Sequence, residues 1–386
     1  MIETRGESFP EIRESVRKLC VRFPDAYWRA RDREREYPTE FVQALTREGF
    51  LAVLIPEEYG GAGLPLSAAA AILEEIHRSG GNAAAAHAQM YTMGTILRHG
   101  SAAQKQTYLP AIAKGELRLQ AFAVTEPDSG TDTTRIATTA RRDGERYIVS
   151  GQKVWISRAE HSDLMLLLAR TSPRDDAKPT DGMSVFLVDV REAVGRGLTI
   201  RPVRTMTNHA TTELFFDNLE IPRENRIGEE GQGFRIVLDS MNPERILIAA
   251  ECIGDGRFFI ERAAAYAGER QVFGRAIGEN QGVQFPIARA YVQVSAAAEM
   301  VVKAAALFEA GAPCGTEANM AKLLASEASW FAADMCLQIH GGMGFAEEFD
   351  IERKFRETRL YQIAPVSTNL ILSHIATHVL NLPKSF

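Results

Sequence analysis

Several features that mark common classes of protein are missing from this sequence. Its four cysteines are far apart and none belongs to a CxxC pair, so neither a zinc site nor a redox dithiol is indicated. Acidic residues outnumber basic ones by 50 to 44, which gives no general attraction to the phosphates of nucleic acid. We therefore expect reduced thiols, no bound metal and no nucleic-acid partner.

Long apolar stretches are also absent. The N-terminal residues MIETRGESFPEIRESV lack the apolar run of a signal peptide. No later segment holds the roughly 18 uninterrupted apolar residues that a membrane span requires. Internal repeats and low-complexity segments are missing as well. These absences predict a cytoplasmic protein that has no membrane partner.

What is present is a chain of 386 residues with three different textures, long enough for more than one core. From residue 11 to about 118, apolar residues recur at helical spacing, as at Phe41 and Leu45. Short segments rich in β-branched and aromatic residues follow, with turn residues between them. These segments are Arg146–Val149, Ser184–Val188 and Glu213–Phe216.

The helical pattern returns after Gly233, in apolar segments at 234–247, 258–266, 283–308 and 321–339. Such long segments are typical of a helical bundle. We therefore predict an α+β protein with three parts. They are an N-terminal α-helical domain at 1–118, a middle antiparallel β domain at 119–230, and a C-terminal helical bundle domain at 231–386.

Four short motifs carry the functional signal. In Phe122–Asp132 (FAVTEPDSGTD), a strand runs into a hydroxyl-rich turn that contains glycine. Such a turn can bind a phosphate or a flavin edge, although it can also be a plain β-turn. With Lys153–Ser157 (KVWIS), Arg270–Gly274 (RQVFG) and Gln338–Gly342 (QIHGG), the chain resembles the acyl-CoA dehydrogenases.

The resemblance runs from Pro56–Gly61 (PEEYGG) to Tyr361–Ile363 (YQI). It implies the fold of that family, which has N-terminal helices, a middle β domain and a C-terminal four-helix bundle. It also implies non-covalent FAD. A diphosphate needs a cation with fixed N–H donors and glycines that admit close approach, and part of the family site lies across a subunit interface. The residues implied to bind FAD are Phe122, Val124, Thr125, Thr131, Trp155, Ser157, Arg270, Phe273, Gln281, Gln338, Gly341, Gly342, Ser367 and Asn369.

Taken singly, these residues have ordinary interpretations. An isolated arginine such as Arg270 is most often a surface residue, Trp155 a core residue, and Gly341 a helix stop. Their occurrence together, at the spacing of the family, favours the cofactor site.

The catalytic base is expected at an unusual position. Removing an α-proton from a thioester requires a carboxylate that is shielded from water. Most family members carry a glutamate two residues after the YQI segment, where this chain has Pro365. A minority, including isovaleryl-type and long-chain enzymes, carry it on a bundle helix before an arginine. Glu244 in Met241–Arg245 (MNPER) matches that place, although it could also be a solvated helix carboxylate.

The same resemblance places acyl-CoA near Thr131, Asn242 and Arg245. Pro243 is expected to remove one helical hydrogen bond and to kink the helix. Pro365 also lacks the backbone N–H that helps to polarise the thioester carbonyl in the family, a loss that typically costs about 10² to 10³ in rate. We expect either that the N–H of Val366 substitutes or that the preferred acyl group needs less polarisation.

Three histidines are given structural roles. His209, within the altered sequence Thr207–Ala210, is interpreted as a loop residue, although a CoA contact is the alternative. His374 and His378 lie at i, i+4 without the glutamate of an HExxH motif, which favours a structural role over metal binding.

The predicted reaction is FAD-dependent α,β-dehydrogenation of an acyl-CoA thioester to trans-2-enoyl-CoA. By analogy with the family, electrons pass to electron-transfer flavoprotein and the enzyme is a homo-oligomer, commonly a tetramer. The alternatives are a flavin monooxygenase or oxidase on the same fold, and a catalytically silent acyl-CoA-binding homologue. The acyl chain and the choice between dimer and tetramer stay open.

Overall fold

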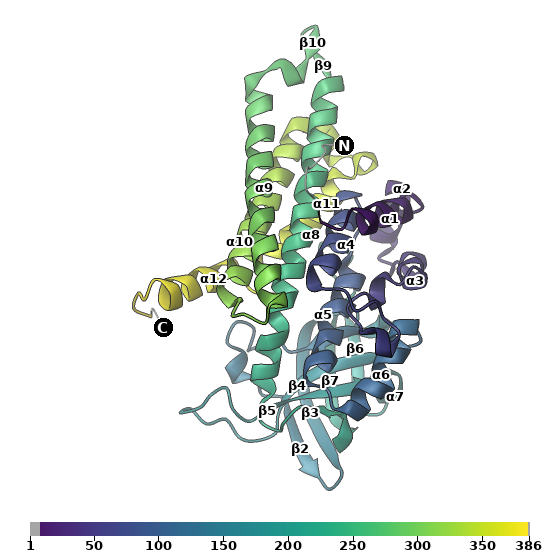
Figure 1. Ribbon diagram of the computed structural model, residues 1–386, viewed down its shortest axis with the longest axis vertical. Helices are drawn as coiled ribbons and strands as arrows, with labels where there is room; N and C mark the ends of the chain where they lie inside the picture. Colours follow the sequence, from purple (N-terminus) through teal and green to yellow (C-terminus); the bar gives the residue numbers. More distant parts are fainter. Residues whose placement is uncertain (1–7, 385–386) are drawn as a thin grey trace. The chain divides into compact units, whose positions relative to one another are not determined.

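The structure is a computed structural model that describes residues 8–384, and Figure 1 shows the course of the chain. The described chain forms two compact units. The first, here the helical unit, contains the chain up to Glu34, Pro65–Ala83 and the chain from Asn242 onward. The second, here the sheet unit, contains Arg35–Leu64 and Ala84–Met241.

The sheet unit is built on one eight-stranded sheet. Its path is β6-β7-β3-β2-β4-β5-β8, and β1 pairs with β4. Most pairs are antiparallel, as predicted, but β1 and β2 pair with β4 in parallel. The strands are β1 Leu119–Ala123, β2 Thr139–Asp143, β3 Arg146–Ser157, β4 Leu164–Arg170, β5 Met183–Asp189, β6 Leu198–Pro202, β7 Thr211–Pro222 and β8 Arg226–Ile227.

Helices cover one face of this sheet. Strand β4 is buried along its whole length, because both of its faces are covered. Leu164 and every second residue after it pack with apolar residues of α5 and α6, whereas Met165 and every second residue after it pack on the other face of the sheet. Helix α6 begins at a capping box formed by Ser101 and Gln104. The helices of this unit are α3 Thr39–Arg47, α5 Ala84–His99, α6 Ala102–Lys114 and α7 Val190–Ala193, with short 3-10 turns η1 Phe50–Ala52, η2 Glu57–Tyr59, η3 Thr133–Arg135, η4 Ala159–His161 and η5 Arg223–Asn225.

The helical unit contains the long helices seen in Figure 1. Helix α8 spans Gly233–Glu269 and is continuous through Pro243, so the two apolar segments expected at 234–247 and 258–266 belong to one helix that starts in the sheet unit. The other helices are α1 Pro10–Val21, α2 Asp25–Glu34, α4 Leu66–Arg78, α9 Gln281–Glu309, α10 Gly315–His340, α11 Ile351–Arg359 and α12 Thr368–His374.

Short elements join these helices. A hairpin of β9 Gln271–Val272 and β10 Arg275–Ala276 connects α8 to α9, and it is labelled at one end of the long helices in Figure 1. The remaining turns are η6 Ile277–Glu279, η7 Gly341–Phe345, η8 Glu347–Phe349, η9 Leu360–Gln362 and the π-helical turn η10 Ile375–Val379. Helices, a β domain and long helices follow one another along the chain, which confirms the predicted α+β fold.

A close approach of α4 and α8 shapes the interior of the helical unit. A Cβ at Gly254 on α8 would lie 2.3 Å from the carbonyl oxygen of Glu74 on α4, so only glycine fits there without a shift of the backbone. This crossing brings His77 of α4 against Asp255 of α8.

Helix α9 is the one helix in residues 8–384 that is long and apolar enough to cross a membrane, judged by length and composition. Only 28% of its most apolar window is buried within the chain. Phe285, Val292 and Val302 are among its exposed apolar side chains. Within the part of the chain that the structure describes, α9 therefore presents an apolar face that stays exposed.

Candidate functional site

The loop after β1 is fixed by a buried ion pair. The Nζ of Lys153 donates to the carbonyl of Val124 at 2.8 Å and to Oε1 of Glu126 at 2.9 Å. The same carboxylate accepts the backbone N–H groups of Ala137 and Thr138 at 2.6 and 3.0 Å. Four hydrogen bonds from three donors thus hold the TEPDSG turn in one conformation.

The ionisation of this pair follows from its surroundings. Burial alone would raise the pKa of the Glu126 carboxyl, but Lys153 and the N–H donors outweigh burial and lower that pKa. Burial lowers the pKa of Lys153 to about 8, against the opposing effect of Glu126. Sequence reasoning missed this pair, because Lys153 was considered only as the start of the KVWIS motif.

Trp155 lies at an irregularity of β3. The register between β3 and β7 shifts between Lys153 and Ile156, and Trp155 adopts a left-handed conformation with φ 62°. Its side chain is 60% exposed, which excludes the core position that a tryptophan usually takes. Strained backbone and an exposed indole are typical of a ligand contact.

The other predicted residues of this unit surround the same loop. Phe122 and Val124 pack partly against the core cluster beneath α5 and α6, while Thr125 is half-buried and accepts the N–H of Val154 through its carbonyl at 2.9 Å. Thr131 is exposed, and Ser157, at the end of β3, is half-buried.

Two further side chains meet beside the end of β3. Arg158 is buried and its guanidinium lies 3.2 Å from Nε2 of His209. Burial, with the charge of Arg158 second, lowers the pKa of His209 well below its ordinary value. His209 is therefore a neutral contact of Arg158, which fits the structural role expected for it.

In the helical unit, the RQVFG motif forms a tight hairpin. Phe273 and Gly274 are its central residues, and both have positive φ, 52° and 79°, as a two-residue hairpin turn requires. Phe273 is fully exposed and Arg270 is exposed at the end of α8. A fully exposed phenylalanine in this conformation is suited to a partner outside the chain.

The remaining predicted cofactor residues of the helical unit are accessible. Gln281 begins α9 and Gln338 is exposed near the end of α10. A Cβ placed on Gly341 or Gly342 would meet nothing within 4 Å. Ser367 caps α12 through its hydroxyl, which accepts from the N–H of Leu370 at 3.3 Å, and Asn369 is exposed.

Glu244 lies on α8, in the helical unit. Its residue is partly exposed, yet burial of the carboxyl raises the pKa to about 8, with Arg245 opposing the shift and Glu251 adding to it. The guanidinium of Arg245 donates to Oδ1 of Asn242 at 3.0 Å. The Nε of Arg245 is buried and has no hydrogen-bond partner within residues 8–384, so a donor is available for another group.

The segment around Pro365 is tied to α10. Lys322 is fully buried, and its Nζ donates to the carbonyl of Val366 at 2.7 Å. Burial lowers the pKa of Lys322 to about 8. The ammonium thus fixes the peptide that follows Val366.

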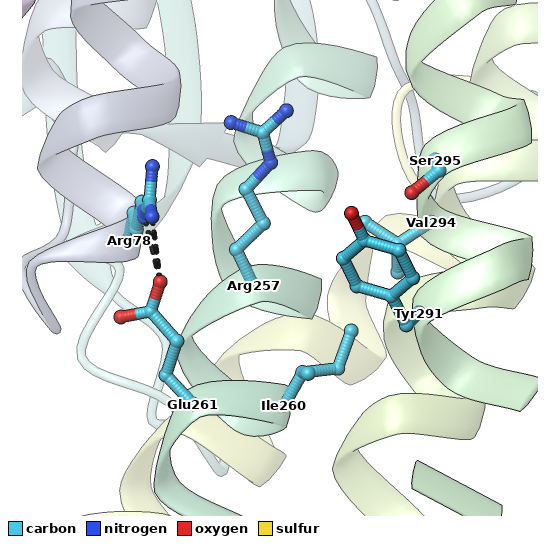
Figure 2. A pocket seen from close by; sticks show the side chains of 7 residues that line it. All are labelled: Arg78, Arg257, Ile260, Glu261, Tyr291, Val294 and Ser295. Carbon is cyan, nitrogen blue, oxygen red and sulfur yellow. Dashed lines mark hydrogen bonds and ion pairs between the residues drawn. The ribbon is translucent and has the colours of Figure 1, made fainter. Parts of the chain in front are cut away.

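A small hollow lies elsewhere in the helical unit, between α8, α9 and the end of α4 (Figure 2). Arg78 donates to Glu261 at 2.7 Å across it, and Arg257 pairs with Glu74 at 2.5 Å. None of the residues predicted for the site lines this hollow. Both arginines of its lining are paired with a carboxylate, which fits a structural role.

Comparison with protein families gives three matches that together span most of the chain. The N-terminal domain model of acyl-CoA dehydrogenase matches residues 7–116, the middle domain model 121–219 and the C-terminal domain model 231–380.

Similar proteins carry the same description. The acyl-CoA dehydrogenase FadE12 of Mycobacterium tuberculosis is 34% identical, with 99% of this chain and 98% of the relative covered. The glutaryl-CoA dehydrogenase of Desulfococcus multivorans is 35% identical, with 97% and 96% covered.

Solved structures agree. A glutaryl-coenzyme A dehydrogenase in complex with glutaryl-CoA superposes with a TM-score of 0.89 at 31% identity, covering 100% of this chain and 98% of the other. A chain in a structure of the electron transferring flavoprotein of Acidaminococcus fermentans superposes with a TM-score of 0.91 at 29% identity. The match covers 99% of this chain and 100% of that chain. A structure of PigA with FAD and proline superposes with a TM-score of 0.90 at 26% identity, and the match covers 99% of this chain and 100% of that chain.

Proposed function

Because this chain belongs to the acyl-CoA dehydrogenase family, we propose that it removes two hydrogens from the α and β carbons of an acyl-CoA thioester, giving trans-2-enoyl-CoA. The observation that carries the assignment of roles is the pKa of Glu244, raised to about 8. A general base works best when its pKa lies near the working pH. Glu244 therefore takes the α-proton.

FAD is the expected cofactor, and the accessible residues suit it. Trp155 and Phe273 expose aromatic surface, Arg270 offers a cation for a diphosphate, and Gly341 and Gly342 leave space for a close approach. When bound, FAD supplies the acceptor for the β-hydrogen and its electron pair. The chain itself supplies Glu244 for the α-proton and the loop held by Lys153 for cofactor binding.

The substrate is assigned to polar groups near Glu244. Arg245 and Asn242 form one hydrogen-bonded pair, and we assign to it the CoA thioester. Thr131, the third residue that the resemblance implies for the substrate, is exposed. Pro365 has no N–H to donate to the thioester carbonyl. We assign that role to the N–H of Val366, whose residue is kept in place by Lys322.

The test is anaerobic. Wild-type protein and Glu244→Gln, both loaded with FAD, are mixed with linear, branched and cyclic acyl-CoAs while flavin absorbance is followed. Bleaching by some thioester in the wild type but not in the variant supports both the reaction and the base. FAD binding without bleaching in either protein contradicts the dehydrogenase assignment. Oxygen consumption then separates an oxidase or monooxygenase from a silent binding protein.

The partners follow from the family and from α9. We propose a cytoplasmic homo-oligomer, with the tetramer as the expected form, that passes electrons to electron-transfer flavoprotein. The exposed apolar face of α9 is the surface that a second copy would cover. Light scattering of the purified protein tests this, since a monomer at micromolar concentration would contradict it.

A further inference from the structure

Lys153 stands at an inward-facing position of strand β3. Side chains of a strand alternate between its two faces, and the inward face of β3 carries Tyr147, Val149 and Lys153, all fully buried. An ammonium in such a position is costly unless it is paired and hydrogen-bonded. Its Nζ donates to Oε1 of Glu126 at 2.9 Å, which supplies the pair. This ion pair accounts for the burial of the lysine, but not for its second hydrogen bond.

The second bond reaches the peptide between Val124 and Thr125. The Nζ of Lys153 donates to the carbonyl of Val124 at 2.8 Å. This peptide is trans, because the one cis bond in residues 8–384 joins Ala364 to Pro365. The C=O and N–H of a planar trans peptide point in opposite directions. The N–H of Thr125 therefore points away from the lysine.

That N–H takes no part in the hydrogen bonds of its own loop. The carbonyl of Thr125 accepts the N–H of Val154 at 2.9 Å, and the N–H of Glu126 donates to the carbonyl of Ser129 at 3.2 Å. The N–H of Thr125 itself has no acceptor in residues 8–384. Thr125 is half-buried, and N–H groups that become buried are almost always paired. A molecule that covers this loop must therefore supply an acceptor.

A flavin ring has the acceptors that this position requires. Its two ring carbonyls gain negative charge when the flavin is reduced, so a donor hydrogen bond to one of them stabilises the reduced ring more than the oxidised ring. An ammonium bonded to the carbonyl side of a peptide polarises that peptide and makes its N–H a stronger donor. Lys153 is bonded to the Thr125 peptide in this way.

We propose that Lys153 is a positioning residue that orients and strengthens the N–H of Thr125 as a donor to a carbonyl of the flavin ring, and thereby favours reduced over oxidised FAD. The inference rests on the proposed function in one respect, namely that FAD is the cofactor. Because Glu126 neutralises the charge of Lys153, the lysine acts through the bonded peptide and not as an isolated charge near the flavin.

The test requires a variant that lacks the ammonium and still folds. Lys153→Met alone leaves the Glu126 carboxylate buried without its cation, which is strongly destabilising. The double variant Glu126→Gln/Lys153→Met removes both charges, and neutral replacement of a buried ion pair is often tolerated. Glu126→Gln alone is its matched partner, since it keeps the lysine beside the carbonyl of Val124. These two variants differ only in the side chain at position 153.

The first readout is the ratio of the affinities for reduced and oxidised FAD, which the reduction potential of the bound flavin reports. Burial lowers the pKa of Lys153 to about 8, so the measurement is made at pH 6.5, where the ammonium is charged. The preference for reduced FAD should be about tenfold smaller in the double variant than in Glu126→Gln, which is a potential lower by about 30 mV for a two-electron couple. Equal potentials in the two variants would overturn the inference.

The second readout reports the N–H of Thr125 itself. FAD labelled with ¹³C at one or the other ring carbonyl is bound to each variant, and the infrared bands of the labelled carbonyls are compared. One band should move to higher frequency in the double variant, because its hydrogen bond is weaker. A site that is merely loosened would bind oxidised and reduced FAD less tightly by the same factor. If neither band moves, the route through Thr125 is wrong.

Both readouts are obtained without acyl-CoA, which keeps them separate from the proposed reaction. If no acyl-CoA bleaches the flavin but the potential and one band shift as expected, the dehydrogenase assignment fails and the role of Lys153 stands. If an acyl-CoA bleaches the wild type but the two variants have equal potentials, the role of Lys153 fails alone. A wild-type protein that binds no FAD contradicts both.

Discussion

Lys153 and Glu126 form a buried ion pair of 2.9 Å between β3 and the loop after β1. Removing one partner of such a pair leaves an uncompensated charge, which typically costs about 3 to 5 kcal/mol. We therefore expect Lys153→Met to lower the free energy of unfolding by about that amount and to reduce flavin content. Urea unfolding and the flavin-to-protein absorbance ratio measure the two effects.

Arg146→Met is the control for that variant. Arg146 lies on the same strand and pairs with Glu220 at 2.8 Å, but both side chains are about half exposed. Exposed pairs contribute about 0 to 1 kcal/mol, so this variant should retain stability and flavin. Equal losses in the two variants would mean that the loop does not depend on the buried pair.

The pH dependence of catalysis should report Glu244. Its pKa of about 8 belongs to the free enzyme, and the base must be deprotonated to act. The value of kcat/KM should therefore rise with pH and level off above about 8. Stopped-flow flavin reduction at low acyl-CoA concentration measures kcat/KM. A rise in kcat/KM that levels off near pH 4 to 5, about the pKa of an ordinary carboxyl, would contradict the role of Glu244.

The same raised pKa should lower stability at alkaline pH. The folded protein holds a proton on Glu244 that the unfolded chain has already released, so this group's contribution is present below the unfolded pKa and is lost as pH rises towards about 8. We expect Glu244→Gln to melt at a higher temperature than the wild type at pH 8.5, with little difference at pH 4.5. A constant difference in melting temperature between pH 4.5 and pH 8.5 would mean that Glu244 has the same pKa in the folded and the unfolded protein.

Cofactor affinity should depend on the hairpin between β9 and β10. Arg270 is exposed beside Phe273, and a charge-assisted hydrogen bond contributes about 1.5 to 3 kcal/mol. Arg270→Gln should therefore weaken FAD binding by roughly tenfold to a hundredfold, measured by titrating the apoprotein calorimetrically. Arg141→Gln, an exposed arginine on β2, serves as the control and should bind FAD normally.

The order of elements could be predicted because it depends on local periodicity. The strands Arg146–Val149, Ser184–Val188 and Glu213–Phe216 and the later helices follow from apolar spacing. The parallel pairing of β1 with β4 could not be predicted, since it depends on contacts between distant segments. The unbroken α8 was missed because Pro243 and the polar residues around 255 interrupt an otherwise apolar pattern.

The candidate site could likewise be predicted only where it depends on local sequence. The motifs pointed to Trp155 and Phe273, and the structure shows both exposed and with positive φ. Their role in binding stays a prediction. Nothing in a single sequence indicates that His77 meets Asp255, 178 residues away. Charged residues at apolar positions of a helix, such as Glu251 and Asp255, were the one available sign of a buried cluster.

The exposure of Trp155 has an optical consequence. Of the three tryptophans in the chain, Trp28 is 5% exposed and Trp330 is half-buried against Phe355, whereas Trp155 is 60% exposed. The indole of Trp155 therefore emits in an environment close to water, and a flavin stacked beside it would quench that red-shifted emission first. The proposed cofactor site would thus carry its own fluorescent reporter of loading.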